Sequence, residues 1–330
     1  MTQGTTILVA PDSFKGTFSA MEVAEAIGRG IGMDVVDLCP LADGGEGTVE
    51  TMVAATRGRI EEVQVHDPIG RTCLGKIGWL DHRTAVIESA SASGLTLVDV
   101  DERDPLAAST YGTGELIVAA RLAGARRILL GVGGTATTDG GLNAIRAIEL
   151  AGGLGGSRLE ILCDVRTPFE EAAKIYSAQK GASPSDIRHL TKRLRQLALK
   201  LPRNPTGIPG SGAGGGLAGG LWSQYDARLV AGAQTILDSV NFNSRLESAV
   251  AVVTGEGCFD AQTLEGKLVA EVVSRAAAAG VPVHIVAGSI DATAGQIAQI
   301  RPASIRTAST PELIRRAGSE IRRFVPTSLG

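Results

Sequence analysis

The sequence Arg126-Arg-Ile-Leu-Leu-Gly-Val-Gly-Gly-Thr-Ala-Thr-Thr-Asp-Gly-Gly141 decides the fold class, because an apolar run meets a glycine turn before a helical pattern begins. This order predicts a strand, a turn and a helix. The glycines can adopt positive φ and carry no Cβ, so that backbone N–H groups could converge on an anion. The positive end of the following helix would strengthen such a site. We therefore expect nucleotide and phosphate binding at Gly133, Gly134, Thr135, Thr138 and Asp139.

Composition limits the classes of function. The chain has 330 residues, which is enough for two domains with separate cores. Its net charge of −3 lacks the basic excess that binding to nucleic acid or to an anionic membrane requires. The chain shows no basic leader, and no apolar run approaches the roughly 20 residues of a membrane span. We expect a cytoplasmic protein with small-molecule partners and no membrane or nucleic-acid partner, and a homodimer stays open.

Strands alternate with helices at both ends of the chain, whereas a meander interrupts the middle. A buried strand is expected over residues 6–10, and the capping box of Ser19 and Glu22 predicts a helix to Arg29. Short strands joined by turns are expected between residues 61 and 88. This pattern predicts a doubly wound parallel sheet with a second region between its two halves.

Two further turns place charged residues directly after predicted strands, at the edge where open α/β sheets bind ligands. The first contains Asp12, Ser13 and Lys15, and Lys15 could neutralise a substrate carboxylate or a transferring phosphoryl group. In the second, Asp43 and Glu46 flank glycines at a helix start. Capping would explain one of these carboxylates, so that two of them favour a metal ion or a substrate hydroxyl as a ligand.

A similar set of residues follows a strand that we expect to end at Thr254. It consists of Gly255, Glu256, Asp260 and Lys267. Acid and base in one glycine-rich turn suggest metal and phosphate together, although a helix cap with a surface ion pair would also explain them.

The segment 204–220 is rich in proline and glycine. It could form a hinge, a second phosphate loop or both. In the second case the phosphate-binding residues would be Gly212, Gly214 and Gly215.

Two known nucleotide motifs fit poorly. The turn Gly131-Val-Gly-Gly-Thr-Ala136 matches the dinucleotide-binding fingerprint. This fingerprint also requires an acidic residue about 20 positions further along the chain. Asp164 comes more than 30 positions after Gly131, and no G-x-x-x-x-G-K-[ST] string occurs. An NAD-dependent 2-hydroxy acid oxidoreductase stays as an alternative.

A series of ordered motifs runs along nearly the whole chain. They are Ala10-Pro-Asp-Ser-Phe-Lys15, Ala42-Asp-Gly-Gly-Glu-Gly-Thr48, Asp67-Pro-Ile-Gly-Arg71, residues 88–95, Arg103-Asp-Pro-Leu106, Gly112-Thr-Gly-Glu-Leu116, Gly133 to Gly141, Cys163-Asp164, Gln179-Lys-Gly-Ala182 and Thr254-Gly-Glu-Gly257. Through them the chain resembles the type I glycerate kinases. The resemblance implies transfer of the γ-phosphoryl group of ATP to D-glycerate with Mg²⁺, and it favours 2-phosphoglycerate as the product.

The resemblance also implies a fold, and together with the charged turns described above it suggests a set of roles. A discontinuous Rossmann-like domain would comprise residues 1–61 and 230–330, with an inserted α/β domain over 62–229 that contains a mixed or antiparallel sheet. Catalysis would rest on positioning and charge neutralisation. The expected catalytic residues are Lys15, Asp43 and Asp164; the substrate residues are Asp12, Ser13, Glu46 and Arg71; the magnesium ligands are Asp43, Asp164 and Asp260.

The chain departs from the family pattern at one charged position. The family's Gly-Glu-Gly is followed by arginine, whereas Cys258 stands here. The change removes a permanent cation from an expected phosphate region, and Lys267 or Lys180 could compensate for it. A catalytically impaired metabolite-binding homologue is therefore a second alternative.

Overall fold

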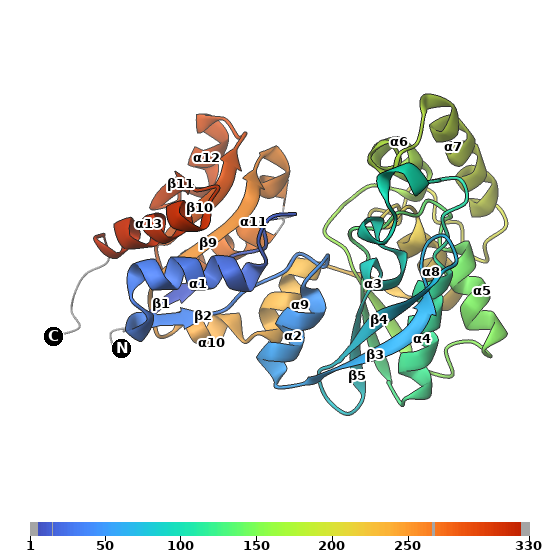
Figure 1. Ribbon diagram of the computed structural model, residues 1–330, viewed down its shortest axis with the longest axis horizontal. Helices are drawn as coiled ribbons and strands as arrows, with labels where there is room; N and C mark the ends of the chain where they lie inside the picture. The colour runs from blue at the N-terminus through green and yellow to red at the C-terminus, as the bar shows by residue number, and fades with distance from the viewer. Residues whose placement is uncertain (1–5, 15, 266–267, 325–330) are drawn as a thin grey trace. The chain divides into compact units, whose positions relative to one another are not determined.

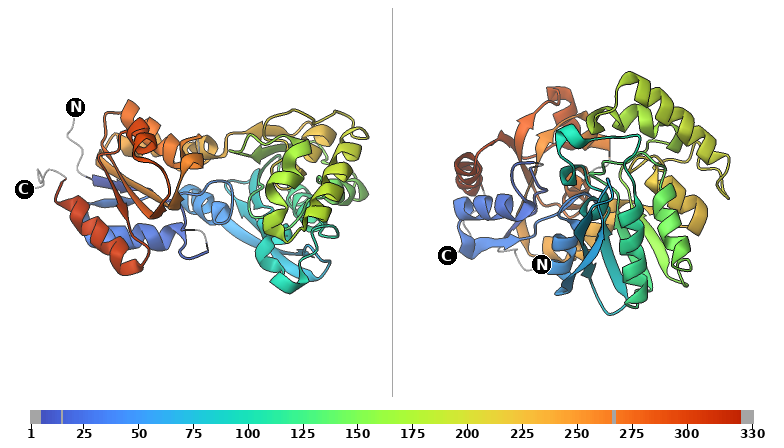
Figure 2. Two further views of the ribbon diagram at one scale, coloured as in Figure 1. Left: turned by 90° about the horizontal axis from the view of Figure 1, so that it is seen from above. Right: turned by 45° about the vertical axis from the view of Figure 1, so that its right-hand side comes forward.

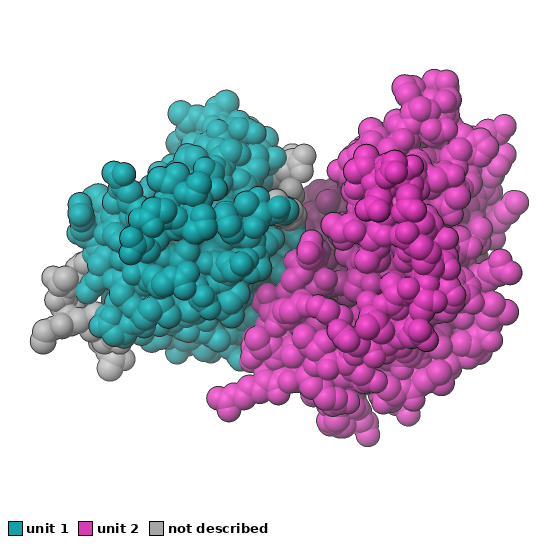
Figure 3. Space-filling model, in the orientation of Figure 1, with its two compact units in different colours: residues 1–43, 233–330 teal, residues 44–232 magenta. Residues whose placement is uncertain are grey.

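The computed structural model describes residues 6–14, 16–265 and 268–324. The chain forms two compact units, Met1–Asp43 with Ala233–Gly330 and Gly44–Gly232, which Figure 3 shows in different colours. Unit 1 is built from both ends of the chain, and unit 2 from its middle. Each unit contains one sheet covered by helices (Figure 1), so that the predicted α/β class with a parallel sheet and a second, mixed sheet is confirmed.

The sheet of unit 1 is entirely parallel, in the order β11-β10-β9-β1-β2. Its strands are β1 (Thr6–Val9), β2 (Val36–Leu38), β9 (Ala249–Phe259), β10 (Val283–Ile290) and β11 (Ser304–Thr307). The helices of this unit are α1 (Ala20–Ile31), α9 (Gly232–Ser239, of which Gly232 still belongs to unit 2), α10 (Phe242–Leu246), α11 (Leu268–Ala278), α12 (Ala294–Ile300) and α13 (Pro311–Arg322). The central strands are apolar in sequence because both faces of the sheet are buried.

Helices α1 and α13 lie side by side on one face of this sheet, as Figures 1 and 2 show. The predicted capping box at the start of α1 is present, because the Ser19 side chain accepts from the Glu22 N–H while Glu22 accepts from the Ser19 N–H. From there, Val23 and Ile27 project every fourth residue into a core that also contains Ile314. The helix is therefore fixed both by a local cap and by packing.

The sheet of unit 2 is mixed, in the order β3-β4-β5-β6-β7-β8. Strands β3 (Arg59–His66), β4 (Thr72–Trp79) and β5 (Thr84–Glu88) form the predicted antiparallel meander, and β6 (Arg127–Gly131), β7 (Arg158–Leu162) and β8 (Arg228–Val230) continue from β5 in parallel. The helices are α2 (Thr48–Thr56), α3 (Ala90–Ser93), α4 (Tyr111–Leu122), α5 (Leu142–Leu150), α6 (Ala172–Tyr176), α7 (Pro184–Ala198) and α8 (Leu217–Tyr225).

The units meet along the chain at 43/44 and 232/233, whereas the sequence placed these boundaries at 61/62 and 229/230. The first boundary lies earlier because α2 packs on the second sheet. A Cβ built on Gly78 of β4 would lie 2.6 Å from Val53 and 3.0 Å from Val49, both in α2. Helix α2 follows strand β2 of unit 1 in the sequence but belongs to unit 2. Local sequence patterns do not show to which unit a helix belongs.

Strand β9 is longer than expected, because it continues through Gly255 and Gly257 to Phe259 instead of turning after Thr254. Strand β10 runs alongside it, with Val286 opposite Gly255 and Ile290 opposite Phe259. A Cβ at residue 255 would lie 1.9 Å from the carbonyl oxygen of Val286. Gly255 therefore serves close strand pairing, and the expected turn at this point is wrong.

Candidate functional site

In unit 2 the carboxyl ends of four parallel strands are aligned. Glu88 at the end of β5 lies opposite Gly131 of β6, Gly131 lies opposite Leu162 of β7, and Leu162 lies opposite Val230 of β8. Ligands of open α/β sheets bind outside such an edge. The edge therefore brings together three segments that the sequence singled out separately, namely residues 88–95, 131–141 and 163–164.

The glycines after Asp43 belong to the same edge. A Cβ on Gly131 would lie 2.3 Å from the carbonyl oxygen of Gly44, and a Cβ on Gly133 would lie 2.9 Å from Cα of Gly45. The two glycine turns are thus in backbone contact, which residues larger than glycine would prevent. Glu46 follows in this turn and is exposed.

Asp164 follows β7 by two residues and is partly exposed at this edge. Its Oδ1 accepts a hydrogen bond of 2.8 Å from the N–H of Gly232, which begins α9. A carboxylate at a helix N-terminus is favoured by the helix dipole. This contact fixes the orientation of the carboxyl group for which the sequence predicted a catalytic or metal-binding role.

The helix that follows the glycine turn is capped by Asp139. Its Oδ1 accepts from the Gly141 N–H at 3.0 Å, and its Oδ2 accepts from Asn143 and from both the N–H and the hydroxyl of Thr110. The Thr110 hydroxyl accepts in turn from the Ala144 N–H. The first N–H groups of α5 are therefore occupied, and the expectation that this helix end adds to an anion site is wrong.

The second glycine run packs against the first. The Gly140 N–H donates to the Gly215 carbonyl at 3.1 Å, and a Cβ on Gly215 would lie 2.0 Å from the carbonyl oxygen of Thr137. The Gly212 N–H donates to the carbonyl of Thr167. Gly214 and Gly215 adopt positive φ just before α8, as the missing Cβ allows. This run supports the turn at 133–141, and nothing in its geometry marks it as a separate phosphate loop.

What remains open to a ligand is the start of the turn. Gly133 is partly exposed and Gly134 is exposed, whereas Thr135, Thr138 and Asp139 are buried. Among the hydrogen bonds of the described residues, none is donated by the N–H groups of Gly133, Gly134 or Thr135. Three successive N–H groups without internal partners form the kind of concavity that binds anions.

Glu88 belongs to this edge, and from the sequence it was noted only as the first residue of a motif, without a role in the site. Its side chain is 7% exposed, and its Oε1 accepts a 2.8 Å hydrogen bond from the Val49 N–H at the start of α2. Burial is the main cause that raises the pKa of Glu88 to about 7, and the neighbouring Glu50 and Glu46 add to the effect. Its place at the end of an apolar strand, before a serine-rich segment, was the available signal.

In unit 1 the predicted residues again lie at the carboxyl edge of the sheet. Asp12 is buried, its N–H donates to the Gly255 carbonyl at 2.8 Å, and its Oδ1 accepts from the Ser13 N–H at 2.7 Å. The Thr254 hydroxyl donates to the carbonyl of Ala10. The segment after β1 is therefore anchored along β9, while Ser13 is partly exposed beside it.

Glu256 and Asp260 lie further along β9 and just after it, both partly exposed. Asp260 and Thr263 form a reciprocal turn, in which Oδ1 of Asp260 accepts from the Thr263 N–H and the Thr263 hydroxyl accepts from the Asp260 N–H. Lys15 and Lys267 lie outside the described residues. Their expected roles stay predictions.

Arg71 is held by its own loop. Its Nε donates to Asp67 at 2.7 Å, and its other two nitrogens donate to Glu102 at 3.0 Å and to the carbonyl of Leu97 at 2.8 Å. These contacts use three of the five N–H groups of the guanidinium. The second N–H of each terminal nitrogen is therefore the group with which Arg71 could bind a substrate carboxylate.

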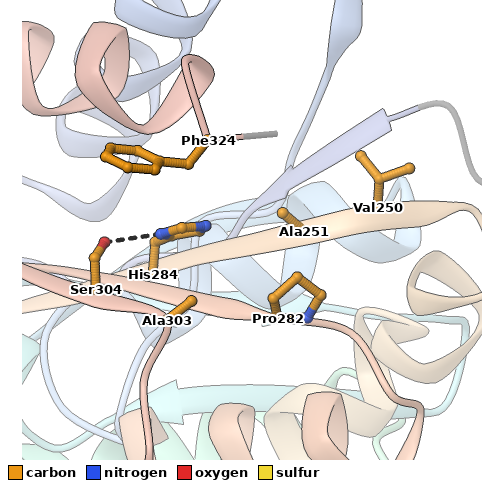
Figure 4. Close-up of a pocket in the computed structure, with 7 residues that line it drawn as sticks. All are labelled: Val250, Ala251, Pro282, His284, Ala303, Ser304 and Phe324. Carbon is orange, nitrogen blue, oxygen red and sulfur yellow. Dashed lines mark hydrogen bonds between the residues drawn. The ribbon is translucent and has the colours of Figure 1, made fainter. Parts of the chain in front are cut away.

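A cavity of about 290 Å³ lies at the opposite edge of the unit 1 sheet (Figure 4). Its lining comes from the amino-terminal ends of β9, β10 and β11 together with Phe324. His284 points into it and shares a 2.8 Å hydrogen bond with Ser304, while burial lowers the pKa of His284. None of the predicted site residues lines this cavity.

Among the described residues, no three His, Cys, Asp or Glu side chains come close enough together to hold a metal ion by themselves. None of the described helices combines the length and the hydrophobicity that crossing a membrane requires.

Known proteins resemble this chain over nearly all of its length. The model of the glycerate kinase family matches residues 7–152 and 149–325. A glycerate kinase of Halalkalibacterium halodurans is 39% identical over 325 residues, covering 86% of each chain, and the glycerate 2-kinase of Escherichia coli is 36% identical, covering 89% of this chain and 87% of the relative. A crystal structure named for glycerate kinase 2 from Salmonella typhimurium LT2 superposes with a TM-score of 0.80 at 32% identity, covering 97% and 98% of the two chains.

These matches and the α/β fold define an enzyme with kinase activity. The chain belongs to the glycerate kinase family.

Proposed function

We propose that this enzyme transfers the γ-phosphoryl group of ATP to D-glycerate and gives 2-phosphoglycerate. The observation that carries the proposal is the match to the glycerate kinase family along both units, together with a relative named as a glycerate 2-kinase. The carboxyl edges of the two sheets support it, because they carry the anion-binding turn and the carboxylates that phosphoryl transfer requires.

The phosphoryl groups of the nucleotide would bind at Gly133, Gly134 and Thr135. The N–H groups of these residues have no hydrogen-bond acceptor among the described residues, and the two glycines are the part of the turn that solvent reaches. Thr138 and Asp139 would act indirectly, since Asp139 caps α5 and the Thr138 hydroxyl shares a hydrogen bond with Ser177. Gly212, Gly214 and Gly215 would likewise hold the turn from behind.

Magnesium would be held by few protein ligands. Mg²⁺ keeps several waters and is bound through one or two carboxylates and the phosphate oxygens of the substrate. Asp43, Asp164 and Asp260 are partly exposed carboxylates near the strand ends, and their hard oxygen donors fit this ion. When bound, the ion would neutralise charge on the phosphoryl oxygens.

The glycerate would bind through hydrogen-bonding groups and through a cation. Asp12, Ser13 and Glu46 offer carboxylates and a hydroxyl for the hydroxyl groups of the substrate, and Lys15 would neutralise its carboxylate or the transferring phosphoryl group. Asp43 or Asp164 would orient the reacting hydroxyl. Because Asp164 is already oriented by the Gly232 N–H, it could accept the hydroxyl proton without reorganising.

The proposal is tested by measuring ADP release with and without D-glycerate, and by phosphorus NMR of the product. We expect glycerate-dependent ADP release and a signal of the 2-phosphate ester. Binding of both ligands without turnover would favour the impaired homologue instead. Glycerate-dependent reduction of NAD, read by absorbance, would favour the oxidoreductase.

The role of Lys15 is tested by Lys15→Ala. We expect turnover to fall at least roughly a hundredfold, because a cation that stabilises phosphoryl transfer contributes several kcal/mol to the transition state. Lys174→Ala is the matched control, since Lys174 is exposed and, within the described part of the chain, forms an ion pair with Glu171 alone, three positions earlier. Equal rates in the two variants would remove Lys15 from the site.

A further inference from the structure

A buried lysine lies behind the glycine turn. Lys180 is 3% exposed, and its Nζ donates to the Thr137 carbonyl at 2.5 Å and to the Thr135 hydroxyl at 3.2 Å. The lysine ends a short 3₁₀ helix, Ala178–Lys180, and Gly181 with positive φ turns the chain away after it. The ammonium group therefore contacts two points of the stretch that follows Gly134.

A second cation holds the next peptide. Arg193 of α7 donates to the Thr138 carbonyl at 2.8 Å and to the Leu106 carbonyl at 2.7 Å. The carbonyl oxygens of Thr137 and Thr138 are thus both directed toward cations. Because the C=O and N–H of a trans peptide point in opposite directions, this removes two electronegative oxygens from the other side of the turn.

The charges of Asp139 and Asp104 act on the cations around the turn, but among the described residues no carboxylate forms an ion pair with them. Within the described part of the chain, Lys180, Arg193 and Arg103 form no ion pairs. Arg103 lies beside Gly181, because a Cβ built on Gly181 would be 3.4 Å from the Cβ of Arg103. Asp139, whose charge acts on Lys180, already accepts from Thr110, Gly141 and Asn143. A buried charge without a partner costs several kcal/mol, so that this arrangement favours binding of an anion.

A buried hydroxyl group without a hydrogen-bond partner also indicates that a ligand binds at the turn. The Oγ1 of Thr137 is fully buried and has no hydrogen-bond partner. It belongs to the residue whose carbonyl Lys180 holds. Buried polar groups are almost always paired, so that an unpaired one in this turn marks a place where a ligand or a shift of the turn completes the bonding.

We propose that Lys180 is a positioning residue of the kinase reaction: it holds the turn from Thr135 to Thr137 so that the N–H groups of Gly133 and Gly134 face a phosphoryl group of the nucleotide, and its ammonium balances the charge of that group. The inference rests on the proposed function, because it takes the turn to be the phosphate site. It adds a residue that acts through the turn and touches neither substrate.

The protonation of Lys180 agrees with this geometry. Burial lowers the pKa of Lys180 to about 7, and only Asp139 opposes this effect. Two further cations belong to neighbouring segments, namely Arg193 of α7, which binds the Thr138 carbonyl, and Arg103, which lies beside Gly181. Both are guanidinium groups that keep their charge. In the free enzyme, Lys180 is therefore charged below about pH 7 and loses its proton above it, whereas a bound phosphoryl group favours the charged form.

The test compares wild type with Lys180→Met, which keeps the length of the side chain and removes the charge. At pH 7 we expect KM for ATP to rise roughly tenfold or more, as for loss of a charge-assisted hydrogen bond, while KM for glycerate changes little. In wild type, KM for ATP should rise up to about tenfold per pH unit above pH 7, and this dependence should be absent in Lys180→Met. The ionisation of ATP itself affects both proteins equally.

Lys174→Met is the control, because it makes the same change at an exposed lysine on the neighbouring helix. A Lys180→Met enzyme with the KM for ATP and the pH profile of wild type would overturn the proposal.

If this variant does not fold, wild-type binding of ADP at pH 8 is measured by calorimetry in two buffers that differ in ionisation enthalpy. We expect uptake of a proton fraction on binding, and binding without uptake would overturn the proposal. Because ADP binding is read without glycerate, failure of the kinase assay stays distinguishable from failure of this inference.

Discussion

The contact between the two glycine runs can be tested by two alanine substitutions that differ in one respect. Gly215 and Gly207 both adopt positive φ, at +68° and +74°, in the same loop. A Cβ on Gly215 would lie 2.0 Å from the Thr137 carbonyl oxygen, whereas a Cβ on Gly207 would meet nothing within 4 Å. The left-handed conformation costs a non-glycine residue roughly 1–2 kcal/mol in both cases. Only Gly215→Ala adds displacement of packed backbone, at about 1–3 kcal/mol or more.

We therefore expect Gly207→Ala to lower the free energy of unfolding by about 1–2 kcal/mol, and Gly215→Ala by about 2–5 kcal/mol or more. At roughly 2–4 °C per kcal/mol, the Tm of the affected unit should fall by about 10 °C in Gly215→Ala and by only a few degrees in Gly207→Ala. Differential scanning calorimetry of both variants measures this. Equal decreases would refute the reasoning, because they would show that the backbone conformation alone, and not the approach of Thr137, requires glycine at residue 215.

The remaining predictions concern titration and thiol reactivity. Burial raises the pKa of Glu88 in the folded state to about 7, so that between about pH 4.5 and 7 the folded state still holds a proton that the unfolded state has released. The free energy of unfolding should therefore fall as the pH rises from about 4.5 to 7, by roughly 3 kcal/mol at most. Glu88→Gln keeps an acceptor for the Val49 N–H and should flatten this dependence in urea unfolding curves; an unchanged slope would contradict the assignment. Cys258 is the exposed thiol, whereas burial raises the pKa of Cys39 to about 12 and that of Cys163 to about 11. Titration with a disulfide reagent should show a fast phase that Cys258→Ser abolishes, and persistence of that phase would contradict this assignment.

Features with a local cause could be predicted from the sequence. The capping box of Ser19 and Glu22 starts α1. The meander of β3, β4 and β5 follows from period-2 patterns between turns. In each case the residues that decide the structure lie within a few positions of one another, so that one sequence contains all the information needed.

Features that depend on distant partners could not be predicted. The glycines of β9 looked like a turn, because nothing near them shows that β10 supplies a partner strand. The helix end at Gly141 looked free to bind an anion, because the hydroxyl and N–H of Thr110 that complete its cap with Asp139 lie 29 residues earlier. The sequence likewise could not show that Arg71 is already bound by Glu102 and Leu97.

Most glycines of the turn at 131–141 serve packing and not ligand binding. Gly131 admits the Gly44 carbonyl at a distance that a Cβ would block, and Gly140 lies against Phe169 and Leu197. Gly134 is different, because a Cβ there would meet only Ala90 at an ordinary 3.4 Å, while the residue itself is exposed with φ of +69°. Packing therefore does not explain glycine at residue 134, whereas its positive φ does. Under the proposed function, this conformation would present successive N–H groups to a ligand. The tightly packed glycines make the turn rigid, and that rigidity would keep the exposed N–H groups in place for a phosphoryl group before the nucleotide arrives.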